Sequence, residues 1–401
     1  MGYLTALSGL SAAANSLSVT GNNIANANTS GFKKSRTEFA DMYSGTLLGA
    51  SKTQPGSGVA LSQVAQQFNQ GNIDTTENIL DLAIGGEGFF TLAQDPTHLN
   101  DMSYTRNGAF KVNSDGAVVN NNGNALMVTD VGGGTLRPLF LPARGLPTAT
   151  STMSLNINLD YNQTPITDTF DPLNAKTYNN RNDSIIYDSL GGQHKMTTYF
   201  TRTSASEWTA HHYITDDPFT PVPIGSGNGT PTTVIPVPST PFAVGPWSPP
   251  NGSNPISITM DYSGSTSFAG PFSVAKISQN GYAAGELTGI SIDGDGLVNA
   301  KFSNGATVPQ AQIALTRFIN PQGLAKIGDT NWKTSIDSGL PVTGNPGTGR
   351  FGNIKSSALE LSNVDLSNQL TNLIVAQQAY QANAQTISTE TSIMQTLLQK
   401  L

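Results

Sequence analysis

Cysteine is absent from this 401-residue chain, which excludes disulfides, thiol nucleophiles, zinc ribbons and iron–sulfur clusters. Charged residues make up only 12%, and a net charge of −7 without a basic cluster argues against nucleic acid and anionic membranes as partners. No apolar run approaches the about 18 residues of a membrane-spanning helix. Residues 1–6 contain no basic segment, and no long apolar segment follows them. We therefore expect no membrane insertion and no Sec-type signal peptide, so that export would need another route.

Catalytic and metal-binding motifs are also missing. The four histidines, His98, His194, His211 and His212, have neither HxxxH nor HExxH spacing. Residues 293–296 resemble the opening of a calcium loop, but the required late glutamate is replaced by asparagine, which favours a hairpin turn. Residues 85–88 and 132–134 lack the lysine and serine or threonine of a phosphate-binding loop. We expect no catalytic, cofactor-binding or metal-binding residue.

The C-terminal region carries the clearest positive pattern. Apolar residues recur every seven positions at Leu366, Leu373, Tyr380, Ile387, Met394 and Leu401, with a companion seam at Leu370, Gln377, Ala384, Thr391 and Leu398. Such a heptad predicts a helix with a coiled-coil seam, over about residues 363–400. Residues 362–365 supply capping side chains and an early acid.

The N-terminal region repeats this pattern. One seam comprises Tyr3, Leu10, Leu17 and Ile24, and the second comprises Leu7, Ala14 and Gly21. We predict a helix over about residues 3–26, weakened by the asparagines at 22–28 and stopped at Gly31.

The faces opposite these seams are almost free of charge. Residues 1–32 contain no charged side chain, and residues 366–401 contain only Glu390 and Lys400. An exposed coiled coil normally carries Glu and Lys beside its seam. On the seams alone, an intramolecular antiparallel pair or a simple dimer is as well supported as an assembly of many copies. The missing charges favour helices that pack in such an assembly.

The middle of the chain changes to a period of two. Residues 154–159 and 289–293 alternate apolar and polar side chains. Hairpin signals punctuate the region at Asn107–Gly108, Asp115–Gly116, Asn122–Gly123, Asn280–Gly281, Asp293–Gly294 and Asn304–Gly305. Frequent glycine (41) and proline (23) also favour turn-rich β structure. We predict antiparallel strands in sandwiches or barrels.

Residues 218–255 stand apart, because they hold 11 of the 23 prolines and no charged residue. Proline at this density blocks the hydrogen bonding of a central strand. We interpret the stretch as an extended, loop-rich surface excursion, either solvated or used for interaction.

The simplest architecture is a mixed α and β fold with nested domains. Coiled-coil-like terminal helices form an inner layer, and two mainly antiparallel, sandwich- or barrel-like β domains are inserted between them. The helical domain and its connecting segment comprise 1–71 with 359–401, the middle β domain 72–147 with 281–358, and the outer β domain 148–280. Termini that lie close together make such insertion easy.

Several long blocks resemble a known family, the rod and hook axial proteins of the bacterial flagellum. They are residues 7–10 and 21–33, 82–90 with 104–110, and 362–367 with 374–384. Residues 279–305 and 318–332 resemble the hook branch in particular, and distal rod proteins lack the large insertion. The resemblance covers about 1–147 and 276–401.

The resemblance implies a structural protein that polymerises into a flexible curved tube outside the cell, a universal joint between rod and filament. Implied partners are identical subunits, the hook cap, the distal rod protein, the hook–filament junction protein and the flagellar type III export apparatus. Alternatives are another axial protein, from the distal rod or the junction, or a secreted β-rich adhesin.

Within this picture, seam residues form the assembly surface. They are Tyr3, Leu7, Leu10, Ala14, Leu17, Ile24, Leu366, Leu370, Leu373, Tyr380, Ala384, Ile387, Met394, Leu398 and Leu401. The connecting segment over about 28–71 is expected to act as a hinge that lets the β domains shift. Its candidate hinge residues are Gly31, Gly45, Gly49, Pro55, Gly56 and Gly58.

Overall fold

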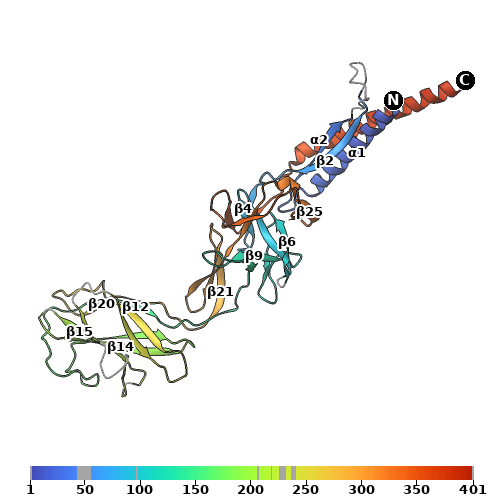
Figure 1. Ribbon diagram of the computed structural model, residues 1–401. Coiled ribbons are helices and arrows are strands. Elements are labelled where there is room, and N and C mark those ends of the chain that lie inside the picture. The colour runs from blue at the N-terminus through green and yellow to red at the C-terminus, as the bar shows by residue number, and fades with distance from the viewer. Residues whose placement is uncertain are drawn as a thin grey trace. The chain divides into compact units, whose positions relative to one another are not determined.

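The fold combines one long helix at each end of the chain with many short strands between them. The computed structural model describes residues 2–42, 56–95, 98–205, 207–217, 219–224, 232–235 and 241–399. Helix α1 spans Gly2–Ala25 and helix α2 spans Leu366–Leu398 (Figure 1). Asp365 caps α2, because its side chain accepts a hydrogen bond from the Asn368 backbone N–H. The prediction of a helix at each end is confirmed.

The described chain divides into two compact units. Unit 1 comprises Met1–Leu141, Ile290–Ala300 and Val308–Leu401, and unit 2 comprises Pro142–Gly289 and Lys301–Thr307. The boundary therefore falls inside strands β21 (Gly285–Ile292), β22 (Leu297–Phe302) and β23 (Thr307–Ile313). We describe each unit by itself.

Unit 1 joins the helices to several small sheets and one larger sheet. The strands before Leu141 are β1 (Ser35–Asp41), β2 (Val59–Gln66), β3 (Ile73–Thr75), β4 (Leu82–Gly85), β5 (Phe89–Asp95), β6 (His98–Thr105), β7 (Lys111–Val112), β8 (Val118–Val119), β9 (Ala125–Thr129) and β10 (Arg137–Pro138). The later elements are β24 (Leu315–Arg317), the 3-10 turn η1 (Pro321–Gly323), β25 (Ala325–Gly328), β26 (Asn331–Lys333), β27 (Val342–Gly344), β28 (Asn353–Ser356) and β29 (Ala358–Glu360).

Within unit 1, the chain enters and leaves the β region side by side. Strand β3 pairs antiparallel with β29, and β4 pairs antiparallel with β28. Strands β9, β5, β6, β26 and β25 follow in that order across the larger sheet. Phe89, Tyr104 and Trp332 from strands of this sheet form an aromatic cluster with Phe318. The segment that enters the β region is thus paired with the segment that leaves it and leads into α2.

Unit 2 consists mainly of two sheets that share one core. Its strands are β11 (Arg144–Gly145), β12 (Thr152–Asn158), β13 (Asn180–Tyr187), β14 (Gln193–Arg202), β15 (Trp208–Ile214), β16 (Val222–Pro223), β17 (Thr232–Ile235), β18 (Phe242–Trp247), β19 (Ile256–Asp261) and β20 (Ser273–Gln279). One sheet has the order β18-β19-β12-β20, and the other contains β13 to β17. Figure 1 labels β12 and β20 of the first sheet and β14 and β15 of the second. Buried side chains such as Leu155 and Ile258 from the first sheet meet Phe200 and Ile214 from the second. This is a sandwich, as predicted, and all strand pairs within it are antiparallel except β12 with β19.

Two sequence predictions of turns are wrong. Asp115–Gly116, Asn122–Gly123, Asp293–Gly294 and Asn304–Gly305 do connect strands that pair with each other. Asn107–Gly108 does not, because β6 pairs with β5 and β26 whereas the following strand β7 pairs with β8. Asn280–Gly281 likewise joins β20 to β21, which pair with other strands. The Asn280 side chain instead accepts hydrogen bonds from the backbone N–H groups of Ser151 and Thr152.

The proline-rich stretch is not only a surface excursion. Within its described residues, β18 forms the edge of a sheet and contributes the fully buried Val244 to the core. An edge strand tolerates proline, because one side of its backbone needs no ladder hydrogen bond. The prediction placed all of 218–255 outside the core and is wrong for β18.

Unit 2 contains a histidine held between two carboxylates. The ring nitrogens of His194 lie 2.6 Å from Asp216 Oδ2 and 3.1 Å from Asp188 Oδ2. Burial opposes protonation, but the two carboxylates outweigh it and raise the pKa of His194. Burial also opposes the charge on Asp188, yet hydrogen bonds from Asn251, His194 and two backbone N–H groups lower its pKa to about 2.

Two further histidines in unit 2 are held neutral. Burial lowers the pKa of His211 to about 4, and burial followed by the charge of His211 lowers the pKa of His212 to about 3. His211 stacks on Phe170 with 3.9 Å between ring centroids. These two residues contribute stability above their ordinary pKa of 6.5, which is lost as the pH falls below it.

We predict that unit 2 loses stability as the pH rises above 6.5. The contribution of His194 is complete below its unfolded pKa of 6.5 and disappears as the pH rises through its higher folded pKa, whereas those of His211 and His212 are constant there. Thermal unfolding of the full chain carrying Trp332→Phe, followed by the fluorescence of Trp208 and Trp247, should show this fall. His194→Gln should abolish it, and parallel curves for both proteins would contradict the assignment.

Candidate functional site

The two terminal helices form an antiparallel pair. Asn23, near the end of α1, donates from Nδ2 to Gln369 Oε1 of α2 at 3.1 Å. At the other end of α1, Gly9 lies against Asn383 of α2, so closely that a Cβ on Gly9 would sit 2.6 Å from Asn383 Oδ1. The helices also lie side by side in Figure 1.

The face of α1 that is covered within the chain is made of small and polar residues. Ala6, Ala13 and Thr20 are buried at a spacing of seven, together with Asn23. Facing them on α2, Gln369 and Ala376 are buried at the same spacing. Small side chains allow the close approach seen at Gly9, so this pairing needs little apolar surface.

The predicted apolar seams are not this contact face. Those of α1 are exposed at Tyr3, Leu7, Ala14 and Gly21 and half-buried at Leu10, Leu17 and Ile24. Those of α2 are exposed at Leu366, Leu370, Gln377, Tyr380, Ala384, Thr391, Met394 and Leu398 and half-buried at Leu373 and Ile387, whereas Leu401 lies outside the described residues. Met394 and Leu398 expose 61% and 68% of their surface, which leaves a large apolar stripe uncovered within one chain.

Asn23 links the helix pair to the strand that follows α1. Its Oδ1 accepts from the Ser35 N–H at 2.9 Å, and its Nδ2 donates to the Ser35 carbonyl at 2.8 Å. With its third bond to Gln369, both N–H donors and the carbonyl oxygen of this 2%-exposed side chain are hydrogen-bonded. Asn23 thereby holds α1, β1 and α2 in one arrangement.

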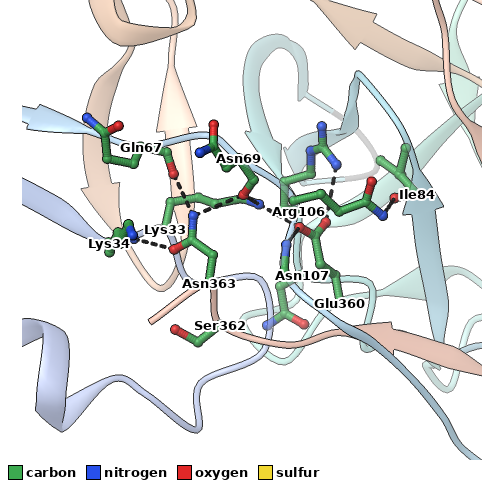
Figure 2. Close-up of polar contacts among 12 residues, drawn as sticks. Lys33, Lys34, Gln67, Asn69, Ile84, Arg106, Asn107, Glu360, Ser362 and Asn363 are labelled. Carbon is green, nitrogen blue, oxygen red and sulfur yellow. Dashed lines mark hydrogen bonds and ion pairs between the residues drawn. The ribbon is translucent and has the colours of Figure 1, made fainter. Parts of the chain in front are cut away.

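A buried ion cluster lies where the helical arms meet the β region (Figure 2). Glu360 Oε1 lies 2.5 Å from Lys33 Nζ, and Glu360 Oε2 lies 3.2 Å from Arg106 Nη1. The Glu360 and Lys33 side chains are fully buried, and that of Arg106 is 5% exposed. Three segments that are distant in sequence are thus joined through one carboxylate.

Backbone groups complete the cluster. Lys33 Nζ donates to the Asn69 carbonyl at 2.8 Å, and the Gly71 N–H donates to Glu360 Oε1 at 2.9 Å. Arg106 Nη2 donates to the Gly86 carbonyl at 2.9 Å. These bonds offset part of the large cost of removing the charges from water.

Asn363 makes a second connection beside the cluster (Figure 2). Its Oδ1 accepts from the Lys34 N–H at 2.8 Å, and its Nδ2 donates to the carbonyls of Gln67 and Asn69 at 2.7 and 2.9 Å. The segment before α2 is therefore fixed to both ends of the connecting segment.

The cluster is electrostatically unbalanced, with two cations on one carboxylate. Burial lowers the pKa of Lys33 and that of Arg106, and Glu360 opposes both shifts. Both cations depend on Glu360, because it is the carboxylate that lies within ion-pair distance of Lys33 and of Arg106 among the described residues.

The connecting segment is partly ordered by strand pairing. Strands β1 and β2 form an antiparallel ribbon, and the Val59 N–H donates to Ser8 of α1 at 3.2 Å. Of the predicted hinge residues, Gly45, Gly49 and Pro55 lie outside the described residues. Gly31 and Gly58 have positive φ values of 70° and 107°, and a Cβ on Gly58 would sit 2.2 Å from Ser8 Oγ. Among the described hinge residues Gly31, Gly56 and Gly58, only Gly56 has open space around it.

Sequence reasoning missed the cluster residues Lys33, Arg106 and Glu360 and the linking residues Asn23, Gln369 and Asn363. One signal was available, because Lys33 is the first charged residue after 32 uncharged ones. Its partner lies 327 residues away, and no local pattern indicates that pairing.

Chemistry other than packing has little support in the described parts of the chain. No group of three or more His, Asp or Glu side chains is placed there to hold a metal ion. Neither described helix is long and apolar enough to cross a membrane.

We predict that Glu360→Ala lowers the free energy of unfolding of unit 1 by about 3–5 kcal/mol, because it leaves two buried cations without their carboxylate. Denaturant unfolding of the full chain carrying Trp208→Phe and Trp247→Phe, followed by the fluorescence of Trp332, measures the loss. Glu87→Ala is the matched control. Glu87 also contacts two arginines, but 57% of its side chain is exposed, so its loss should cost no more than about 1 kcal/mol. Equal effects would contradict the role given to Glu360.

Four family descriptions match the chain in order. They are "Flagella basal body rod protein" over residues 4–33, "Flagellar hook protein FlgE/F/G D1 domain" over 83–167, "Flagellar basal body protein FlaE D2 domain" over 156–282, and "Flagellar basal body rod FlgEFG protein C-terminal" over 355–400. Both helices and parts of both units are therefore covered.

Whole-chain relatives agree. The flagellar hook protein FlgE of Escherichia coli K12 is 35% identical, with 99% of each chain covered. That of Borreliella burgdorferi is 32% identical, covering 98% of this chain and 97% of its own. The crystal structure of Helicobacter pylori flagellar hook protein FlgE2 matches 72% of this chain and all of its own, with a TM-score of 0.52 at 17% identity, a likeness of fold. With full-length relatives above 30% identity, the chain belongs to the flagellar hook protein family FlgE, a structural and not an enzyme family.

Proposed function

We propose that this protein is the subunit of the flagellar hook and polymerises into a curved, flexible tube that transmits torque from rod to filament. The family supports the first part of the proposal. The observation that carries the second is the outward apolar stripe on both terminal helices, which the chain itself leaves uncovered. A monomer gains nothing from that stripe, whereas an assembly buries it.

In this proposal, the helices of neighbouring copies form a coiled-coil-like inner layer through their seams. Burying one large apolar side chain contributes about 1.5–3 kcal/mol, and each chain offers Tyr3, Leu7, Leu10, Ala14, Leu17, Ile24, Leu366, Leu370, Leu373, Tyr380, Ala384, Ile387, Met394, Leu398 and Leu401. Because the remaining faces are nearly free of charge, neighbouring helices can slide slightly without breaking ion pairs. Such sliding would make the tube easy to bend.

The three-domain division remains part of the proposal: 1–71 with 359–401, 72–147 with 281–358, and 148–280. The sandwich of unit 2 supports the outer domain, and the paired strands β3–β29 and β4–β28 support a middle domain entered and left at one point.

The number of proposed hinge residues at which flexibility can be tested becomes smaller. Gly31 and Gly58 adopt backbone conformations that other residues rarely tolerate, so an alanine there would strain the fold whatever it does to bending. Gly56 is the position where an alanine would test flexibility alone.

Further partners follow from the proposed function. They are the hook cap during growth, the distal rod protein at one end, the hook–filament junction protein at the other and the flagellar type III export apparatus, with the finished hook outside the cell. A rod or junction component is less well supported, because relatives named as hook proteins match over the full length.

The first test compares the full chain with a truncated chain of residues 72–358 by electron microscopy under polymerising conditions. We expect curved tubes from the full chain and none from the truncated chain, because the latter lacks both helices. Tubes from the truncated chain, or none from the full chain in the presence of cap and rod proteins, would overturn the proposal.

A second test places a charge in the seam. Ile387→Asp should be secreted normally but reduce assembled hooks at least tenfold, since a buried unpaired carboxylate costs several kcal/mol. Gln385→Asp, an exposed position of α2 outside the seam, is the control and should retain most hooks. Normal hooks from Ile387→Asp would show that the heptad is not an assembly surface.

A further inference from the structure

Ile336 is the most exposed large apolar residue in the described chain, with 100% of its surface accessible. An exposed carboxylate, Asp337, follows it directly. Single exposed apolar residues are common, so exposure alone does not identify an interaction site. The way in which this residue is held distinguishes it.

The loop that carries Ile336 is fixed by hydrogen bonds on both sides. Ser335 and Ser338 bond to each other, the Ser335 hydroxyl donates to the Gly323 carbonyl, and Asn320 Nδ2 donates to the Asp337 carbonyl at 3.0 Å. Little conformational entropy remains to be lost if Ile336 binds a partner, which is the property of a preorganised anchor.

The same unit contains an open pocket of about 650 Å³. Aromatic rings of Phe68, Phe89 and Phe318 line it, and Ile319 and Val342 stand at its rim with 86% and 51% of their surface exposed. This lining suits an apolar side chain.

The pocket also has an excess of positive charge. Arg106, Arg317 and Arg350 line it. Arg106 is paired with the buried Glu360, whereas Arg317 and Arg350 share one lining carboxylate, Glu87. Arg317 lies 2.6 Å from Glu87 and Arg350 only within 3.8 Å, and the buried Arg106 Nε has no acceptor among the described residues. In a chain of net charge −7 this local excess is complementary to an acidic group.

One turn separates the pocket from the Ile336 loop. Ile319, Pro321 and Gln322 line the pocket, whereas Asn320 and Gly323 contact the loop. The two features therefore lie on either side of the turn. An anchor on one side and a pocket on the other are the elements of a head-to-tail contact, which generates an open helical polymer.

We propose that Ile336 and Asp337 of one copy occupy this pocket in the next copy. The isoleucine side chain packs against the phenylalanine rings, and the Asp337 carboxylate approaches Arg350 and Arg317. This contact rests on the proposed hook function and adds to the helix seams a specific contact between β regions of neighbouring subunits.

The absence of cysteine makes the contact directly testable by disulfide trapping. Chains carrying only Ile336→Cys are mixed with chains carrying only Val342→Cys, polymerised and oxidised. We expect disulfide-linked dimers in polymers and none in unpolymerised chains. Val112→Cys, a 45%-exposed apolar position of unit 1, replaces Ile336→Cys as the control and should give no dimers.

The outcomes separate this contact from the proposed function. Polymers that form normally but show no more cross-linking than the Val112→Cys control overturn the contact and leave the hook function standing. Failure of the unmodified chain to polymerise with its cap and rod proteins overturns both. As a second measurement, Ile336→Asp should leave the melting temperature unchanged and reduce polymer yield at least tenfold relative to Val131→Asp, a 51%-exposed control. Equal yields would also overturn the contact.

Discussion

The buried carboxylate of Glu360 is the constraint on which the arrangement of the chain ends depends. Lys33 follows α1, Glu360 precedes α2, and Arg106 belongs to the β region, so the three charges can be satisfied only when these segments meet. A buried cation without a carboxylate costs several kcal/mol, which excludes most other registers of the two arms. Backbone groups of Asn69, Gly71 and Gly86 also form hydrogen bonds with the three charged side chains. The junction is therefore specific in geometry as well as in charge.

Once the arms are set by this junction, the helices need only modest forces to pair. Their shared face consists of alanines, a glycine and hydrogen-bonded polar side chains, of which Asn23 and Gln369 are the clearest example. Such a face contributes little hydrophobic free energy, and single helices are only marginally stable in water. The stronger apolar stripe points away from the partner helix. The exposed apolar residues of this stripe add little to the stability of an isolated subunit, but they would stabilise an assembly that buries them.

Sequence periodicity predicted the helices and the core alternation of β12, because both depend on local repeats. Hairpins were predicted correctly where consecutive strands pair, as at Asp115–Gly116, and wrongly at Asn107–Gly108 and Asn280–Gly281, where the flanking strands pair elsewhere. The heptads identified the apolar stripe, but periodicity does not say which surface covers it. The ion cluster could not be predicted, since Lys33 and Glu360 are related only through the complete fold. Val244 in the proline-rich stretch shows that edge strands accept compositions typical of loops.

Polar and apolar contacts therefore have different roles. Polar contacts with demanding geometry set the fold within one subunit, at Glu360 and at Asn23. Apolar surfaces with tolerant geometry remain for contacts between subunits. Apolar contacts change little in energy over small displacements, whereas hydrogen bonds weaken steeply when their geometry is distorted. A tube that bends while it rotates must let neighbouring subunits shift without letting any subunit unfold. In the proposed assembly, a rigid polar junction inside each copy and nearly charge-free helix faces between copies satisfy both requirements.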